Sequence, residues 1–197
     1  MGKRGLYRHH LPALFSYRFK RAIGVLGGSF NPAHEGHIAL SKAAMLHGKF
    51  DQIWWLVSPQ NPLKSAEDMA DFEARLAYAR KLAQGLPWLR VLDVERQTAS
   101  HYSYETLVLL QKRAPSARLT WLMGTDNLVQ FPQWHRAKDM AELMPFMVFR
   151  RATSFYPALA SKGRRYFKKS HLQIVTNFHH NSSATALRNQ GFWHSKA

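Results

Sequence analysis

The chain lacks cysteine and is poor in acidic residues. Without thiols it can form neither disulfides nor thiolate metal sites, so a metal would need histidine, carboxylate or substrate oxygens, and the composition fits a reducing, cytoplasmic setting. No apolar run approaches the roughly 20 residues that span a bilayer, which predicts no membrane association. Only 12 Asp and Glu stand against 28 Lys and Arg, and the net charge of +16 attracts nucleotides or nucleic acids.

The excess positive charge gathers in two stretches of the sequence. Residues 1–34 contain no acidic side chain, and residues 162–169 mix basic with aromatic side chains. We expect residues 1–20 to form a basic N-terminal extension and residues 21–197 to fold as a single domain. A solvated face is the simpler interpretation of both stretches, and a nucleic-acid-binding module is the distant alternative.

Strand-like and helical patterns alternate along the chain. Apolar, strand-like runs cover residues 22–26, 52–57, 89–94, 118–123, 146–149 and 172–175. Helical patterns cover residues 38–46, 71–84, 104–113, 137–144 and 184–189, with a polar loop expected after Gly124 and irregular structure over 151–171. The alternation predicts an α/β fold: a Rossmann-like, doubly wound parallel sheet of five to six strands with helices on both faces. Such sheets bind ligands at the carboxyl ends of their strands.

A strand-turn-helix motif near residue 30 carries most of the chemical information. The first apolar run leads into Gly27-Gly28-Ser29-Phe30-Asn31-Pro32-Ala33-His34-Glu35-Gly36-His37. Paired glycines let a backbone turn tightly and approach a ligand without a Cβ in the way. A helix N-terminus attracts anions, and two histidines three residues apart can face the same pocket. The motif therefore predicts a site for a phosphate-bearing substrate.

A second motif, Ser183-Ala184-Thr185-Ala186-Leu187-Arg188, lies near the end of the sequence. Hydroxyl side chains at the start of a helix cap free N–H groups or bind a phosphate. An N-cap followed by a surface arginine would explain this segment on its own. Its pairing with the first motif favours the phosphate.

Together the two motifs resemble the signatures of the nucleotidyltransferase superfamily that carries the His-x-Gly-His sequence, and in particular its bacterial nicotinate-nucleotide adenylyltransferases. The resemblance extends over residues 22–191 and includes three further segments: 59–64, 101–107 and 124–135. The last two separate nicotinate-nucleotide enzymes from other members of the superfamily. Asn31 stands where the family usually has Asp, and the loop at 59–64 lacks the family's Pro-Pro-His triplet.

The resemblance implies transfer of the adenylyl group of ATP to nicotinate mononucleotide, giving deamido-NAD and pyrophosphate in NAD biosynthesis by in-line displacement. Because the attacking phosphate is already an anion, catalysis consists of positioning and charge neutralisation. Mg²⁺ would be bound mainly through ATP phosphates. ATP and nicotinate mononucleotide are thus the expected partners, with no obligate nucleic acid, and a homo-oligomer is left open. Sister enzymes acting on nicotinamide mononucleotide or another phosphorylated acceptor share this chemistry and are the alternative.

The resemblance also implies roles for individual residues. The catalytic set consists of basic side chains that neutralise charge on the phosphates: His34, His37, Lys64 and Arg188. The ATP-binding set is Gly27, Gly28, Ser29, Phe30, Gly124, Asp126, Ser183 and Thr185. The set for the nicotinate nucleotide is Ser103, Thr106 and Trp134, with the indole stacked on the pyridine ring.

Overall fold

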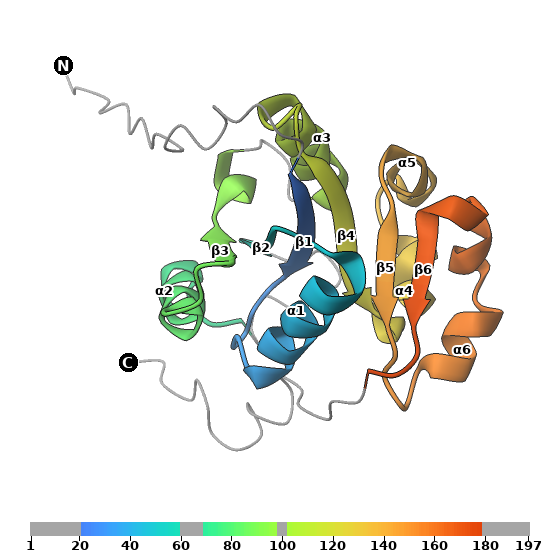
Figure 1. Cartoon of the computed structure of the whole chain (residues 1–197), viewed down its shortest axis with the longest axis horizontal. Helices are drawn as coiled ribbons and strands as arrows, with labels where there is room; N and C mark the ends of the chain where they lie inside the picture. The colour runs from blue at the N-terminus through green and yellow to red at the C-terminus, as the bar shows by residue number, and fades with distance from the viewer. Residues whose placement is uncertain (1–20, 60–68, 98–101, 179–197) are drawn as a thin grey trace.

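The computed structural model describes residues 21–59, 69–97 and 102–178 of the chain. Their centre is a parallel sheet of six strands in the order β3-β2-β1-β4-β5-β6 (Figure 1). The strands are β1 (Ala22–Gly28), β2 (Gln52–Val57), β3 (Leu89–Leu92), β4 (Arg118–Gly124), β5 (Phe146–Phe149) and β6 (Leu172–Val175). The predicted fold class, a Rossmann-like parallel sheet, is confirmed.

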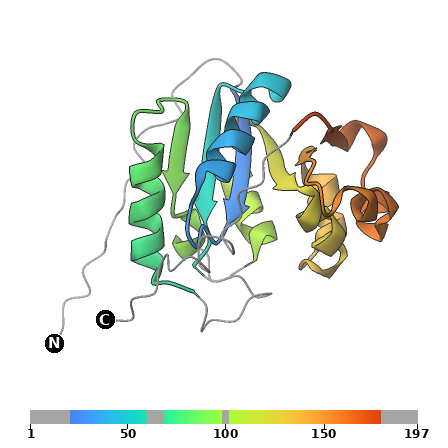
Figure 2. The ribbon, with the colours of Figure 1, turned by 90° about the horizontal axis from the view of Figure 1, so that it is seen from below.

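Helices cover both faces of this sheet. The longer ones are α1 (Glu35–Gly48), α2 (Phe72–Ala83) and α3 (Ser103–Arg113). The shorter ones are α4 (Thr125–Gln130), α5 (Ala137–Leu143), α6 (Phe155–Ala160) and the 3₁₀ turns η1 (Val94–Gln97), η2 (Phe131–Gln133), η3 (Lys162–Tyr166) and η4 (Lys169–His171). Seen from below, the chain from β4 onward gathers on one side of the molecule, and β1, β2, α1 and α2 lie on the other (Figure 2).

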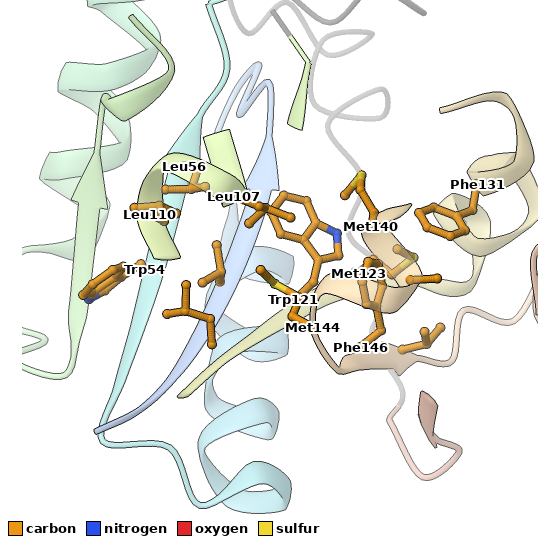
Figure 3. Close-up of a cluster of buried hydrophobic side chains, with 14 of the residues drawn as sticks. Trp54, Leu56, Leu107, Leu110, Trp121, Met123, Phe131, Met140, Met144 and Phe146 are labelled. Carbon is orange, nitrogen blue, oxygen red and sulfur yellow. The ribbon is translucent and has the colours of Figure 1, made fainter. Parts of the chain in front are cut away.

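An apolar core lies on each face of the sheet, between the strands and the helices that cover them. Alternate residues of each strand point to opposite faces, because successive side chains in a strand alternate. Trp55 of β2, for example, packs with the buried side chains of α1 and α2. Trp54 and Trp121 pack instead with those of α3, α4 and α5, as Figure 3 shows around Trp121. Continuously apolar strands are therefore explained by burial on both faces.

Two segments are more regular than the sequence predicts. The expected polar loop after Gly124 is helix α4 followed by η2, because Leu128 and Phe131, three residues apart, are both fully buried against the sheet. The stretch 151–171 contains α6 and two 3₁₀ turns, with Ala158 buried and the basic side chains of 162–169 directed outward. Among the described residues, none of the helices is both long and apolar enough to cross a membrane.

Candidate active site

Of the predicted site residues, those that the structure describes lie near the point where the strand order reverses. The chain runs outward from β1 through β2 to β3, then returns to place β4 on the other side of β1. Leu26 of β1 is in register with Leu122 of β4, so the two strands end at the same level. In open α/β sheets the crevice beyond such a pair of strand ends is the usual ligand site. The β1–α1 and β4–α4 junctions both lie at this edge of the sheet.

The turn after β1 is held in an unusual backbone conformation. Phe30 has a φ of 46°, in the left-handed region that bulky residues rarely occupy. Its side chain is buried, and its ring lies 5.0 Å from the Trp55 ring and 4.7 Å from the His37 ring, centroid to centroid. The packing of Phe30 thus fixes both the course of the turn and the orientation of His37.

The two glycines before this turn belong to β1, and their roles differ. A Cβ on Gly27 would lie 2.7 Å from Trp121 Cζ2, so glycine here makes room for the indole of β4. A Cβ on Gly28 would have its nearest neighbour, a Phe30 ring atom, at 3.6 Å, which is an ordinary contact. The fold would therefore tolerate a Cβ at Gly28 but not at Gly27, so the packing shown here does not by itself require glycine at residue 28.

A capping box built from two histidines begins helix α1. His34 is the N-cap, and its Nδ1 accepts a hydrogen bond from the Gly36 N–H at 3.0 Å. His37 occupies the third helical position, and its Nδ1 accepts from the His34 N–H at 3.1 Å. The helix thereby satisfies backbone donors that would otherwise lack partners. His34 is 6% exposed, so its ring is largely enclosed.

These capping bonds also determine where each imidazole carries its proton. Because Nδ1 accepts from the backbone in both rings, a neutral ring must carry its hydrogen on Nε2. The ring centroids are 4.0 Å apart. The start of α1 therefore combines two neighbouring imidazoles, each with its N–H on Nε2 when neutral, with the positive end of the helix dipole, a combination suited to an anion.

A buried arginine that the sequence analysis did not single out joins the neighbouring loops. Arg75, in the first turn of α2, donates from Nε to Ala70 O at 2.9 Å and from Nη2 to Pro59 O at 2.7 Å. Its Nη1 donates to Ser58 O at 2.8 Å and also to Ser29 O. Three segments thus meet at a single guanidinium: the loop after β1, the loop after β2 and the entry to α2.

Glu95, in η1, is also buried beside this group of loops. The Ser58 hydroxyl donates a hydrogen bond to its carboxylate, and the side chain is 4% exposed. Burial raises the pKa of Glu95 to about 7, and the Ser58 hydrogen bond opposes that rise. The hydrophobic periodicity of the sequence does not indicate that Glu95 and Arg75 are buried, because charged residues are ordinarily exposed.

On the other side of the crevice, side chains link the ends of β4 and β5. Thr125 Oγ1 accepts from the Arg151 N–H at 2.9 Å and shares a hydrogen bond of 2.7 Å with Ser154 Oγ. Arg151 Nε lies 3.3 Å from Asp126 Oδ1. A Cβ on Gly124 would lie 2.8 Å from Arg151 Nε, so this glycine accommodates the ion pair.

The start of α3 and the segment around Trp134 lie against each other. His135 Nε2 is 3.3 Å from Glu105 Oε1, and the His135 ring stacks on Tyr102 at 4.3 Å. Trp134 is partly buried, with its ring edge-on to Trp121 and Phe131. The contact between the start of α3 and the segment around Trp134 thus brings together two parts of the chain that carry predicted pyridine-binding residues.

The predicted pyridine-binding residues differ in accessibility. Ser103 is partly buried at the first position of α3. Thr106 is fully buried, and its hydroxyl donates to Tyr102 O at 3.5 Å, so in this structure it supports the helix start. Four predicted residues, Lys64, Ser183, Thr185 and Arg188, fall outside the described residues, as does the expected extension at 1–20.

The donors at this site suit anions better than a protein-bound metal. The described residues include no group of three His, Asp or Glu side chains able to hold a metal ion. The donors at the β1–α1 junction are imidazole N–H groups and a helix N-terminus, whereas Mg²⁺ takes oxygen ligands.

Comparisons with known proteins show the family to which the chain belongs. A model of the cytidylyltransferase-like family matches residues 25–190. A Parvibaculum lavamentivorans protein named probable nicotinate-nucleotide adenylyltransferase is 47% identical over 129 residues, which are 66% of this chain and 64% of that protein. An Erythrobacter litoralis protein of the same name is 41% identical over 170 residues, 86% of this chain and 73% of that one. The match to the first thus spans slightly less than two thirds of its length.

Solved structures share the fold at low sequence identity. The Plasmodium falciparum nicotinic acid mononucleotide adenylyltransferase complexed with NaAD has a TM-score of 0.70 at 18% identity, covering 86% of this chain and 83% of that one. The same enzyme complexed with APC gives a TM-score of 0.68 at 17% identity, with the same coverage. These likenesses show the fold alone.

Proposed function

Because the chain belongs to the nicotinate-nucleotide adenylyltransferases of the cytidylyltransferase-like family, we propose that it transfers the adenylyl group of ATP to nicotinate mononucleotide. The products are deamido-NAD and pyrophosphate. The proposal is supported most directly by the paired histidines at the start of α1. The two rings, whose Nδ1 atoms both accept from backbone, lie 4.0 Å apart, centroid to centroid, after the carboxyl end of β1, where a phosphate would bind.

The reaction is a single displacement at the α-phosphorus of ATP. A phosphate oxygen of the mononucleotide forms the new P–O bond, and the bond to the bridging oxygen of the β-phosphate breaks, so pyrophosphate leaves with the electron pair. His37 donates from Nε2 to the α-phosphate as charge develops on it, and His34 binds the phosphates alongside. Donors fixed in advance lower the barrier most in such a step.

The remaining phosphate contacts are assigned to residues of both motifs. Lys64 would hold the nucleotide phosphate or the leaving pyrophosphate, and Arg188 with Ser183 and Thr185 the β- and γ-phosphates. The backbone near Gly28 would lie along the nucleotide, which would explain a glycine at a position where the fold itself would tolerate a Cβ. Mg²⁺ would arrive as part of the substrate, on the phosphate oxygens of ATP.

The far side of the crevice would bind the two rings. Gly124 and Asp126 would contact the adenosine. Ser103 and Trp134 would frame the pyridine ring, with the indole offering a flat apolar face. Thr106, which is buried, would act by holding the start of α3 in place.

The test is pyrophosphate release from the purified chain with Mg²⁺, comparing nucleotide donors and acceptors in parallel. Nicotinate mononucleotide and nicotinamide mononucleotide are offered with ATP, and nicotinate mononucleotide is also offered with CTP. We expect fast release only with ATP and the acid. Preference for the amide would keep the mechanism and change the acceptor, and silence with both acceptors would overturn the proposal.

A further inference from the structure

Arg75 is a cation in a place that normally disfavours one. Its side chain is 1% exposed, and it lies in the first turn of α2, where the helix dipole repels positive charge. Burial lowers the pKa of its guanidinium, and the nearby Asp71 carboxylate raises it; an arginine stays protonated under either influence. A leucine would fill the same interior at lower electrostatic cost. The charge therefore needs an explanation other than packing.

The hydrogen bonds of Arg75 supply that explanation. The four described above all end on backbone carbonyls, at Ser29, Ser58, Pro59 and Ala70. A side chain bound to carbonyls fixes the course of the main chain, whatever side chains the bound residues carry. Only a planar guanidinium has enough donors, spread widely enough, to bind carbonyls of three segments together.

Other bonds join the same three segments. The Ser58 N–H donates to Gly28 O at 2.9 Å, which ties the loop after β2 to the end of β1. Asn31 Oδ1 accepts from the Ala70 N–H at 3.2 Å, which ties the turn after β1 to the entry of α2. Arg75 lies at the centre of this group of bonds. The replacement of the family's usual Asp by Asn31 keeps the acceptor that the group needs.

A short path leads from Arg75 to the histidine of the phosphate site. Arg75 binds the carbonyl of Ser29, and the next residue, Phe30, is held at a positive φ with its ring 4.7 Å from that of His37. A shift of the turn would therefore move the Phe30 ring, against which the His37 ring packs. Misplacing a catalytic group by about 1 Å can cost on the order of a hundredfold in rate.

We propose that Arg75 is a positioning residue for adenylyl transfer, holding the turn after β1, and with it His37, in register with the loop after β2. The proposal rests on the proposed function, because the site that Arg75 would position is the phosphate site. Arg75 itself contacts backbone carbonyls and would touch no reacting atom.

The test compares Arg75→Lys with Arg80→Lys, a matched change on the same helix. Arg80 is about half exposed, and its guanidinium forms an ion pair of 3.9 Å with Asp93. The measurements are the melting temperature, kcat and KM for ATP, and amide hydrogen exchange. For Arg75→Lys we expect a folded protein with kcat at least about tenfold lower, KM for ATP changed less than about threefold, and faster exchange confined to residues 27–37 and Ser58. Arg80→Lys should match the wild type in all three.

The outcomes separate this proposal from the proposed function. If Arg75→Lys turns over normally for each folded molecule, or if Arg80→Lys loses as much activity, the positioning role is wrong. If the wild type adenylylates neither pyridine nucleotide, the proposed function fails, and the exchange measurement still decides the positioning role. In that case, unchanged exchange at residues 27–37 of Arg75→Lys would overturn the positioning role. Faster exchange confined to the two loops would show that Arg75 holds these loops in place, whatever reaction the protein catalyses. Should Arg75→Lys not fold, Arg75→Gln, which keeps two donors, takes its place with the same expectations.

Discussion

Two contacts at this edge of the sheet are made by different means. At the ends of β1 and β2, the loops are joined by bonds to backbone atoms: the capping box of His34 and His37, and the carbonyl contacts of the buried Arg75. At the start of α3, the contact with the segment around Trp134 is made through side chains that are a third or more exposed, as in the pair of His135 with Glu105. The β1 side thus fixes main chain, and on the α3 side the ends of side chains meet.

This difference fits what each side would bind. In-line displacement requires phosphates to be held in one geometry, which buried, fully bonded backbone can provide. Ring recognition tolerates small adjustments, and exposed ion pairs contribute little stability, so the segments they join can move at low cost. We therefore expect substitutions on the β1 side to affect rate and folding strongly, and those on the α3 side to act weakly.

The largest effect is expected at the phosphate site. His37→Ala removes an oriented donor and should lower kcat about a hundredfold or more. His47→Ala, in the last turn of the same helix, is the matched control and should leave kcat unchanged. Initial rates of pyrophosphate release measure both. A near-normal rate for His37→Ala would remove this residue from the chemistry.

The second prediction concerns the pH dependence of stability. The pKa of Glu95 is about 7 in the folded protein against 4.5 for the ordinary carboxyl, so between these values the folded state holds a proton that the unfolded state has released. The contribution of Glu95 to stability is therefore present below about pH 4.5 and is lost as the pH rises to about 7.

Glu95→Gln should abolish this dependence. Relative to the wild type, its free energy of unfolding should rise across the same pH window by up to about 3 kcal/mol. Urea unfolding at a series of pH values gives the difference. A difference between the two proteins that does not vary with pH would contradict the expectation.

The two glycines at the end of β1 provide a smaller, paired effect. Gly27→Ala places a Cβ against Trp121 and should destabilise the fold by about 1–3 kcal/mol. Gly28→Ala meets only ordinary contacts and should fold nearly as well, while weakening ATP binding about tenfold if the nucleotide lies along this strand end. Thermal unfolding and KM for ATP separate the two. Equal losses of stability would show that Gly28 is also a packing position.

The smallest effect is expected on the α3 side. Glu105→Gln removes an exposed pair with His135 and should change stability by less than about 0.5 kcal/mol and kcat by less than about twofold. Raising the ionic strength should make even this difference vanish. A large loss of activity would show that this side is as tightly constrained as the other.

The sequence predicts the sheet well because its signals are local. Residues 53–57, for example, are continuously apolar, which is typical of a strand buried on both faces of a sheet. The helix at Thr125–Gln130 is missed because it is short and stabilised by burial of Leu128, a tertiary effect that a six-residue window does not reveal. Boundaries fall within a few residues of those expected, as with α1, where the capping histidines precede the periodic pattern.

The candidate site is predicted only where side chains have recognisable chemistry. The paired histidines are visible as a motif, and their roles stay a prediction. Arg75 gives no such signal, because in sequence it looks like any other basic residue on a helix surface. Its burial follows from carbonyls at Ser29 and Ser58, which lie 46 and 17 residues away. Backbone acceptors leave no trace in the sequence, so a residue that binds them is found only in three dimensions.

The central place of β1 in the sheet has a consequence for synthesis of the chain. On the ribosome, β1, β2 and β3 are synthesised before Arg118, the first residue of β4. Until β4 is made, one edge of β1 has no paired strand, and the apolar core on that face of the sheet lacks Trp121. An open apolar edge pairs readily with other chains. We expect a fragment ending at residue 116 to form large aggregates in sedimentation, where the whole chain does not. The strand that leads into the proposed phosphate-binding turn is thus left with an unpaired edge while the protein is still being made.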